Sequence, residues 1–143
     1  VALLTSLGDC LIAQGEYERA LEELRAGRQA LSAMGELESE QAAQLLQTIG
    51  IASAELGDFD NALTALEMSR RALQTQDLMG TSQAADLTSL IGDVRTDQGS
   101  FEAALEEYQA AVGIREEGDT LQSEAGAELL SKVGSSLVQL DEV

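Results

Sequence analysis

LGDCLIAQGEYERAL at residues 7–21 returns as IGIASAELGDFDNAL at residues 49–63 and as IGDVRTDQGSFEAAL at residues 91–105. The copies are 42 residues apart, and the glycine near the start of each copy occurs a fourth time, at Gly134. Self-similarity at a fixed period of this length is the signature of a repeat protein, whose stacked copies form an extended surface. We therefore expect one structural unit copied along the chain, and a function of binding rather than catalysis.

The composition favours helices in every copy. The 143 residues include no proline, and 44% of them are hydrophobic, many of them alanine and leucine, which are strong helix formers. We predict an all-α fold, an α-solenoid of antiparallel helix hairpins, with repeats at about residues 1–38, 39–80 and 81–122 and a final helix at 123–141. We expect a single repeat domain over residues 1–143 that is part of a longer array, because apolar residues stand at both ends.

Each copy divides into two helices at a turn glycine. In the first copy, Leu7 and Leu11 have the spacing of one helical face before the turn. The second helices are predicted from about Tyr17 to Met34, Phe59 to Gln76 and Phe101 to Glu117. We expect positive φ angles at the glycines between the two helices, which are Gly15, Gly57 and Gly99.

Residues suited to helix caps also recur. Asp58 and Ser100 precede the second helices of copies two and three, where their side chains can accept hydrogen bonds from the free N–H groups of the helix start. Ser39, Thr81 and Ser123 are placed to cap the first helix of the following copy. The agreement of pattern, turns and caps is typical of a sequence that specifies one structure.

A second set of glycines, Gly8, Gly50 and Gly92, falls inside the first helices. A glycine there costs about 1 kcal/mol relative to alanine, so its recurrence needs a physical reason. We expect the two helices of each hairpin to approach at these glycines until their backbones almost touch, because the facing residues are small alanines. These alanines are Ala20, Ala62 and Ala104.

The chain has one cysteine, so the sequence predicts no internal disulfide. Cys10 lies between Leu7 and Leu11 in a helical pattern. We expect it to be a small apolar filler in the helix packing rather than a reactive thiol.

The formal net charge is −18, from 26 acidic and 8 basic residues. Such a surface repels phosphate, which argues against direct binding to nucleic acid or to an anionic membrane and favours a basic partner segment. The alternative is an acidic coat that only keeps the protein soluble. No apolar run is long enough to cross a bilayer and no secretory signal is present, so we expect a soluble intracellular protein, in the cytoplasm or in an organelle interior.

The sequence offers little for catalysis, and we predict no catalytic residues, no cofactor and no metal site. It contains no histidine and no glycine-rich phosphate loop with a lysine. Asp93, Asp97 and Gly99 miss the spacing of a helix-loop-helix calcium site. We therefore do not expect an enzyme.

The repeated packing residues resemble the tetratricopeptide repeat, and the resemblance covers essentially the whole chain. The 42-residue length is similar to the long form found in kinesin light chains. The resemblance implies a right-handed superhelix whose first helices line a concave face. In the first copy the matching residues are Leu4, Leu7, Gly8, Leu11, Ala20, Leu24 and Gly27.

Residues at the inward offsets of this family are the candidate partner-binding groove. The groove would be acidic and lined by small side chains, which favours a basic or Ser/Thr-rich peptide over a C-terminal carboxylate. The asparagine ladder of kinesin light chains would fall at Ser6, Thr48, Leu90 and Lys132, none of which is asparagine. The candidate groove residues are Thr5, Asp9, Ile12, Gln47, Ile51, Glu55, Asp86, Ser89, Asp93, Asp97, Ser131 and Ser135.

Within this set, Asp86, Asp93 and Asp97 lie on one predicted helix. Three neighbouring carboxylates can hold an arginine or lysine of a partner through charge-assisted hydrogen bonds. The alternative is a solvated helix face that Arg95 partly balances.

Two functions are therefore open. The leading hypothesis is a protein-protein interaction scaffold that binds a partner segment in its groove. The alternative is an accessory structural subunit of a large complex, which contacts its neighbours through its ends and its convex face.

Overall fold

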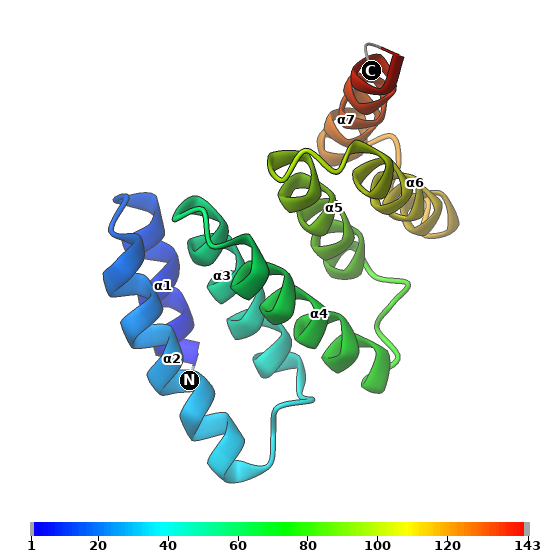
Figure 1. The fold of residues 1–143 in the computed structure, drawn as a ribbon. Coiled ribbons are helices and arrows are strands. Elements are labelled where there is room, and N and C mark those ends of the chain that lie inside the picture. Colours follow the sequence, from blue (N-terminus) through cyan, green and yellow to red (C-terminus); the bar gives the residue numbers. More distant parts are fainter. Residues whose placement is uncertain (1, 142–143) are drawn as a thin grey trace. The chain divides into compact units, whose positions relative to one another are not determined.

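A computed structural model describes residues 2–141, and every regular element in that range is a helix (Figure 1). The all-α prediction is confirmed. The second helices of the hairpins begin at the predicted residues, and α4 ends one residue before the predicted Gln76. The helices are α1 (Ala2–Ala13), α2 (Tyr17–Met34), α3 (Glu40–Glu55), α4 (Phe59–Thr75), α5 (Ser82–Asp97), α6 (Phe101–Glu117) and α7 (Glu124–Asp141).

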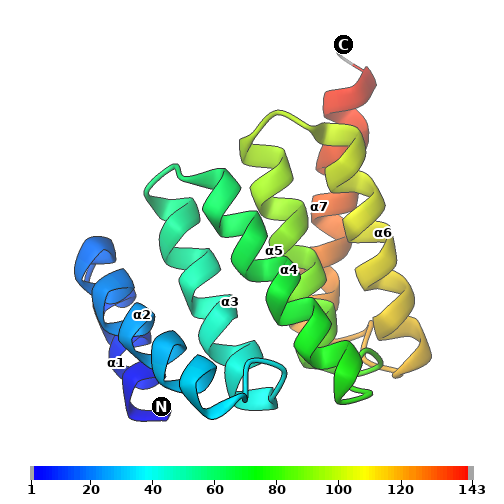
Figure 2. The ribbon, with the colours of Figure 1, turned by 60° about the horizontal axis from the view of Figure 1, so that its bottom comes forward.

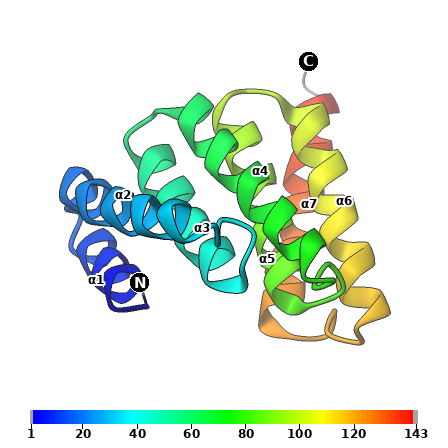
Figure 3. The same cartoon turned by 90° about the horizontal axis from the view of Figure 1, so that it is seen from below.

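The chain forms two compact units, Val1–Gln76 and Asp77–Val143. In unit 1, α1 packs on α2 and α3, and α3 packs on α2 and α4, so the two hairpins can be followed in Figure 2. In unit 2, α6 packs against both α5 and α7 (Figure 3). That the whole chain is a single repeat domain within a longer array remains a prediction.

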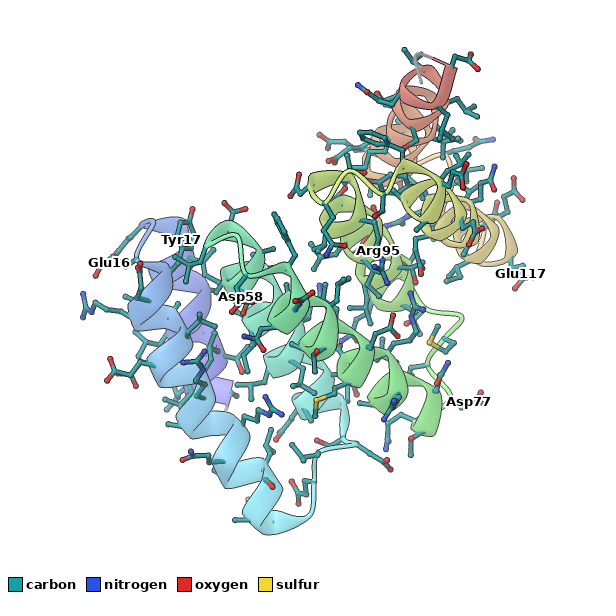
Figure 4. All side chains as sticks on the ribbon, in the orientation of Figure 1. Glu16, Tyr17, Asp58, Asp77, Arg95 and Glu117 are labelled. Atoms are coloured by element: carbon teal, nitrogen blue, oxygen red, sulfur yellow. The ribbon has the colours of Figure 1, made fainter. Side chains whose placement is uncertain are left out.

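Short turns reverse the chain within each hairpin. Gly15, Gly57 and Gly99 have φ angles of 78°, 78° and 79°, which confirms the predicted left-handed turn conformation. Figure 4 labels Glu16 and Asp58, which directly follow two of these glycines and precede α2 and α4. The three turns are therefore built alike, and each places its second helix antiparallel to the first.

The connections after the second helices also use the left-handed conformation. Gly35 has a φ angle of 72°, and the aspartates at the corresponding positions, Asp77 and Asp119, have φ angles of 57° and 55°. Aspartate tolerates this region better than most residues, because its short polar side chain can hydrogen-bond locally. The connections therefore adopt similar turns with different residues.

The predicted caps of the first helices are confirmed. The side chains of Ser39, Thr81 and Ser123 accept hydrogen bonds from backbone N–H groups three residues later, at 3.1, 3.3 and 3.1 Å. Each cap satisfies a donor that a helix start leaves free.

Of the caps predicted for the second helices, one is confirmed and one is wrong. The Asp58 carboxylate accepts from the Asn61 N–H at 3.4 Å, whereas the Ser100 side chain makes no cap hydrogen bond. The ψ angles are 73° at Asp58 and 68° at Ser100, against 164° at Ser39. In this bent conformation the longer carboxylate reaches the N–H group and the short hydroxyl does not.

The glycines inside the first helices make room for one large side chain each. A Cβ atom at Gly8 would lie 2.7 Å from Leu24 Cδ2, and at Gly50 it would lie 2.5 Å from Leu66 Cδ2. At Gly92 it would lie 2.5 Å from Cε1 of Tyr108. We call the space above each glycine a glycine socket. The predicted close approach is therefore present, but mainly a side chain of the second helix fills the space. At Gly50 the backbone is also near, because the Ala62 carbonyl oxygen would lie 3.4 Å from a Cβ atom.

The facing alanines and the occupants of the sockets form the interior of each hairpin. Ala62 and Leu66 are fully buried in unit 1, and Ala104 is fully buried in unit 2, where Tyr108 is nearly so. Each occupant lies four residues after its alanine, so both point to the same face of the second helix. The 42-residue period thus repeats one specific contact.

Gly50→Ala tests the socket. The added methyl group overlaps the buried Leu66 side chain, and overpacking of this kind costs about 1–3 kcal/mol, which exceeds the helix propensity gained from alanine. We expect a net destabilisation of about 1 kcal/mol or more, measured by chemical denaturation. Gly113→Ala is the matched control, because a Cβ there meets no atom within 4 Å and should stabilise α6. Equal effects of the two changes would contradict the socket.

Asp119→Gly tests the left-handed turn before α7. Glycine adopts a φ angle of 55° without steric cost, so this change should raise the free energy of unfolding by about 0.5–1 kcal/mol. Asp119→Ala should lower it, because alanine has neither the conformational freedom of glycine nor the tolerance of aspartate for the left-handed region. Thermal denaturation of both variants measures the difference, and a more stable alanine variant would argue against strain at this position.

Candidate functional site

None of the twelve candidate groove residues is buried. Those of the first two copies lie on α1 and α3 in unit 1, and those of the third copy and the last helix lie on α5 and α7 in unit 2. All of them are therefore on first helices, as predicted. Their joint role as one groove remains a prediction.

In unit 1, a hydrogen bond links two neighbouring first helices. The single hydroxyl proton of Thr48 on α3 is shared between two acceptors, Asp9 Oδ1 on α1 at 3.2 Å and the Gln44 carbonyl oxygen at 3.1 Å. Thr48 is buried, while Asp9 is exposed. Asp9 thus has a partner within the chain, and its outer side remains accessible.

In unit 2, side chains of three helices surround a pocket of about 350 Å³. It lies between α5 and α7, with the start and middle of α6 as its third wall. Three of the candidate residues, Asp93, Ser131 and Ser135, take part in its lining. The complete lining is Asp93, Thr96, Phe101, Tyr108, Glu128, Ser131, Lys132, Ser135, Ser136 and Gln139.

Asp93 is the centre of a polar network on one side of this pocket. Its Oδ1 accepts a hydrogen bond from the Tyr108 hydroxyl at 2.7 Å, and its Oδ2 accepts one from Lys132 Nζ at 3.0 Å. Thr96 Oγ1 lies 3.2 Å from the Tyr108 hydroxyl oxygen. The network joins all three helices of unit 2, because Lys132 comes from α7, Tyr108 from α6 and Asp93 from α5.

Lys132 bridges α7 to α5. Its Nζ also donates to Ser89 Oγ at 3.5 Å and lies 3.7 Å from Glu128 Oε1. The side chain is only 29% exposed, so most of its length is covered. Lys132 therefore neutralises Asp93 inside the pocket wall and presents little free positive charge to solvent.

The Lys132–Asp93 pair repeats the Thr48–Asp9 pair of unit 1, since both join residues 39 positions apart. In each pair, one residue comes from a first helix and the other from the first helix of the next copy. Lys132 is not among the candidate residues predicted from the sequence. Two signals point to it: it is the only lysine of the chain, and it falls on a position that the family resemblance singles out.

Tyr108 has two roles, because its ring fills the socket of Gly92 while its hydroxyl borders the pocket. Burial is the main cause that raises the pKa of Tyr108 well above its ordinary value, and the hydrogen bond and negative charge of Asp93 add to the effect. The negative charge of Asp97 acts in the same direction, while the hydrogen bond with Thr96 opposes it. The phenol is therefore held protonated.

The three aspartates of the predicted cation site have different surroundings. Asp86 forms an ion pair with the buried Arg115 of α6, and Asp93 forms one with Lys132. Arg95 instead donates to Gln98 Oε1 at 3.4 Å. Two carboxylates of the cluster are thus neutralised by cations of this chain, and neither of these cations is the predicted Arg95.

The packing role expected for Cys10 is wrong. Cys10 is exposed on α1 rather than packed between helices. It lies one position before Leu11, which turns it about 100° away from the buried Leu11 side chain. The helical spacing therefore predicted the buried position of Leu11 correctly and that of Cys10 incorrectly.

Among residues 2–141, no group of three or more His, Cys, Asp and Glu side chains is arranged to hold a metal ion. Within the same range, no helix combines the length and the apolar character that a membrane span requires.

Tyr108→Phe tests the network through its pH dependence. The raised pKa means that the unfolded state loses its phenol proton first, at its ordinary pKa of about 10, so this contribution to stability is complete below pH 10 and is lost above it. Between about pH 9 and 11, the free energy of unfolding of the wild type should fall by about 1 kcal/mol more than that of Tyr108→Phe. Denaturant titrations at both pH values measure this, and parallel losses would contradict a buried phenol.

Comparison with known proteins gives the fold. No family model matches the chain, and no curated protein matches it in sequence. Among solved structures, the crystal structure of BtubC (BKLC) from P. vanneervenii is similar, with a TM-score of 0.79 and 15% sequence identity over 99% of this chain. The match covers 60% of that longer chain. The chain therefore has an all-helical repeat fold, which is shared with BtubC.

Proposed function

We propose that this chain is a non-catalytic interaction scaffold of the tetratricopeptide type, which binds a segment of a partner protein. Helical repeat proteins commonly serve protein-protein interaction, and the packing residues at the 42-residue period resemble this family. The observation that carries the proposal is the pocket of unit 2, which combines exposed and half-buried polar side chains with the half-buried Phe101 and the buried Tyr108 and Ser136.

The pocket lining suits a peptide. Ser131, Ser135 and Gln139 offer hydroxyl and amide groups that can both donate and accept hydrogen bonds, as a peptide backbone requires. Phe101 adds an apolar ring for a hydrophobic side chain. The hydrogen bonds around Asp93 hold the wall in place before a partner arrives, which lowers the entropic cost of binding.

The partner segment in this proposal is basic. The chain has a net charge of −18, so a positively charged segment is attracted over a long range. Because Lys132 lies 3.0 Å from Asp93 and 3.7 Å from Glu128, the partner cation would be attracted chiefly by the exposed Asp97, and also by Glu128, whose side chain is 70% exposed. The proposed cation-binding residues are therefore Asp97 and Glu128 rather than Asp93.

An accessory structural subunit is the second candidate. It is favoured by exposed leucines on α1, where Leu3 is 86% exposed and Leu7 is 42% exposed. Apolar side chains gathered on one surface suit a permanent interface with another subunit. A function of this kind would not depend on the unit 2 pocket.

Selection from a displayed library of random peptides tests the scaffold proposal. The wild-type chain should enrich peptides rich in Lys and Arg, and their affinity should fall steeply between about 0.1 M and 1 M salt, because the screening length drops from about 10 to 3 Å. Ser135→Arg places a cation in the pocket and should weaken the selected peptides at least tenfold. Ser32→Arg is the matched control, since it adds the same charge at an exposed position on α2.

Three outcomes would reject the proposal. One is enrichment of acidic peptides, and another is equal loss of affinity in Ser135→Arg and Ser32→Arg. The third is the absence of any enrichment, which would leave the accessory subunit as the better candidate.

A further inference from the structure

The pocket of unit 2 has a more apolar counterpart in unit 1. Each residue of its lining lies 84 residues, which is two repeats, after a residue of α1, α2 or α3. Four of these positions change from a hydrocarbon side chain in unit 1 to a side chain with a hydroxyl group in unit 2. They are Ile12 and Thr96, Leu24 and Tyr108, Ile51 and Ser135, and Ala52 and Ser136.

The hydrocarbon side chains of unit 1 belong to its packed interior. Leu24 and Ala52 are fully buried, and Ile12 packs against the same core. Hydrocarbon removed from water stabilises a fold, whereas a hydroxyl group in the same place must find a hydrogen-bond partner. Polar groups that interrupt a packing pattern in this way are typical of functional sites. The exchange therefore favours a binding site in unit 2 over a purely structural junction of helices.

A helix packed on α7 would leave this pocket accessible. In unit 1, α4 packs on α3, yet α3 residues equivalent to the pocket lining of α7 still reach solvent. Gln44, the equivalent of Glu128, is exposed, and Ile51, the equivalent of Ser135, is half-buried. Access to the pocket is therefore a property of this position in the repeat.

Two hydroxyl groups of the pocket have fewer protons than hydrogen-bond contacts. The Tyr108 hydroxyl donates to Asp93 Oδ1 at 2.7 Å. The Thr96 hydroxyl donates to the Gly92 carbonyl oxygen at 3.0 Å. The oxygens of Tyr108 and Thr96 also lie 3.2 Å apart, but each hydroxyl group has only one proton. Both oxygens therefore keep lone pairs that can accept a hydrogen bond from a ligand.

Ser136 adds a third acceptor. It is only 4% exposed, and it lines the pocket. Its hydroxyl has no hydrogen-bond partner within residues 2–141, and its oxygen remains open to the pocket. By contrast, the buried Thr48 and Thr88 bond to the carbonyl oxygens four residues before them. The Ser136 hydroxyl is therefore available to a ligand.

The charges around the pocket favour a single cation. The lining contains two carboxylates, Asp93 and Glu128, and one ammonium group, that of Lys132, which gives a net charge of −1. The exposed Asp97 adds to the negative field, because its charge contributes to the raised pKa of Tyr108. A ligand with one positive charge and several N–H donors would therefore match both the charge and the acceptors.

We propose that the pocket of unit 2 binds one arginine side chain of the partner segment. A guanidinium group has five N–H donors in a rigid plane, which suits several acceptors in one pocket better than an ammonium group does. Its flat face can stack on the half-buried ring of Phe101. A volume of about 350 Å³ is at the small end of ligand pockets and suits a single side chain. This proposal rests on the scaffold function proposed above and names the residue type that anchors the partner.

N-acetyl-arginine amide is the probe, because it offers the side chain without the rest of a peptide. NMR titration of the ¹⁵N-labelled chain should give saturable shifts of the backbone amides around the pocket. The lysine analogue lacks the planar donors, and the citrulline analogue lacks the charge. Each should bind about fivefold more weakly, which is the effect of losing about one hydrogen bond.

Ser136→Ala removes the available hydroxyl and introduces the residue that unit 1 has at the equivalent position. It should weaken the arginine probe about fivefold. Ser53→Ala is the matched control, because Ser53 is also a buried serine but lies on α3 in unit 1, and it should bind like the wild type. Asp97→Asn should weaken the arginine and lysine probes by the same factor, because it removes only charge.

A double variant, Thr96→Ile with Ser135→Ile, gives the pocket two side chains of unit 1 and fills it. It should abolish the saturable shifts. Its melting temperature should not fall, because the added hydrocarbon packs at a junction that is apolar in unit 1. This result separates loss of the pocket from loss of the fold.

Failure of this proposal can be told from failure of the scaffold function. Library-selected peptides that bind equally well after each arginine is changed to lysine would overturn the arginine pocket and leave the scaffold in place. No saturable binding of the arginine probe, or binding that neither Ser136→Ala nor the double variant changes, would also overturn it. Saturable arginine binding without any enriched peptide would support the pocket and reject the scaffold.

Discussion

The packing of one large side chain into the space above a helical glycine is the contact on which each hairpin depends. Gly8, Gly50 and Gly92 leave room for a leucine or a tyrosine, and a side chain on these glycines would collide with it. The glycines weaken their own helices, so their value lies in the close packing that they permit. The short turns at Gly15, Gly57 and Gly99 reverse the chain within each hairpin, so that the second helix can make this contact.

Local features of the fold followed from the sequence, because they depend on residues close together in the chain. Helix starts, turn glycines and most caps are set within about four residues, and the period confirmed each assignment two or three times. Ser100 was the exception, since its cap depends on a backbone angle that the residue type does not specify. Cys10 was misplaced because a pattern of leucines identifies a face and leaves the neighbouring positions uncertain.

The candidate site was less predictable, because its contacts join residues far apart in sequence. The candidate residues lie on the first helices and none is buried, whereas the pairing of Asp93 with Lys132 and of Asp86 with Arg115 was not foreseen. Such pairs depend on which side chains of separate helices reach one another, and a single sequence gives no direct measure of this. The aspartates looked like free ligands for a partner, and two of them are partly occupied by the chain itself.

If the pocket of unit 2 binds a peptide as proposed, the double position of Tyr108 links recognition to folding within this unit. Its ring is part of the packed interior, and its hydroxyl belongs to the wall of the pocket. A peptide that strengthens the hydrogen bonds of this hydroxyl would also stabilise the hairpin, so occupancy of the pocket would raise the free energy of unfolding. Substitution of Tyr108 is therefore restricted both by the packing of its ring and by the hydrogen bond of its hydroxyl. New binding specificities would arise more readily at Ser131 and Ser135, which are exposed.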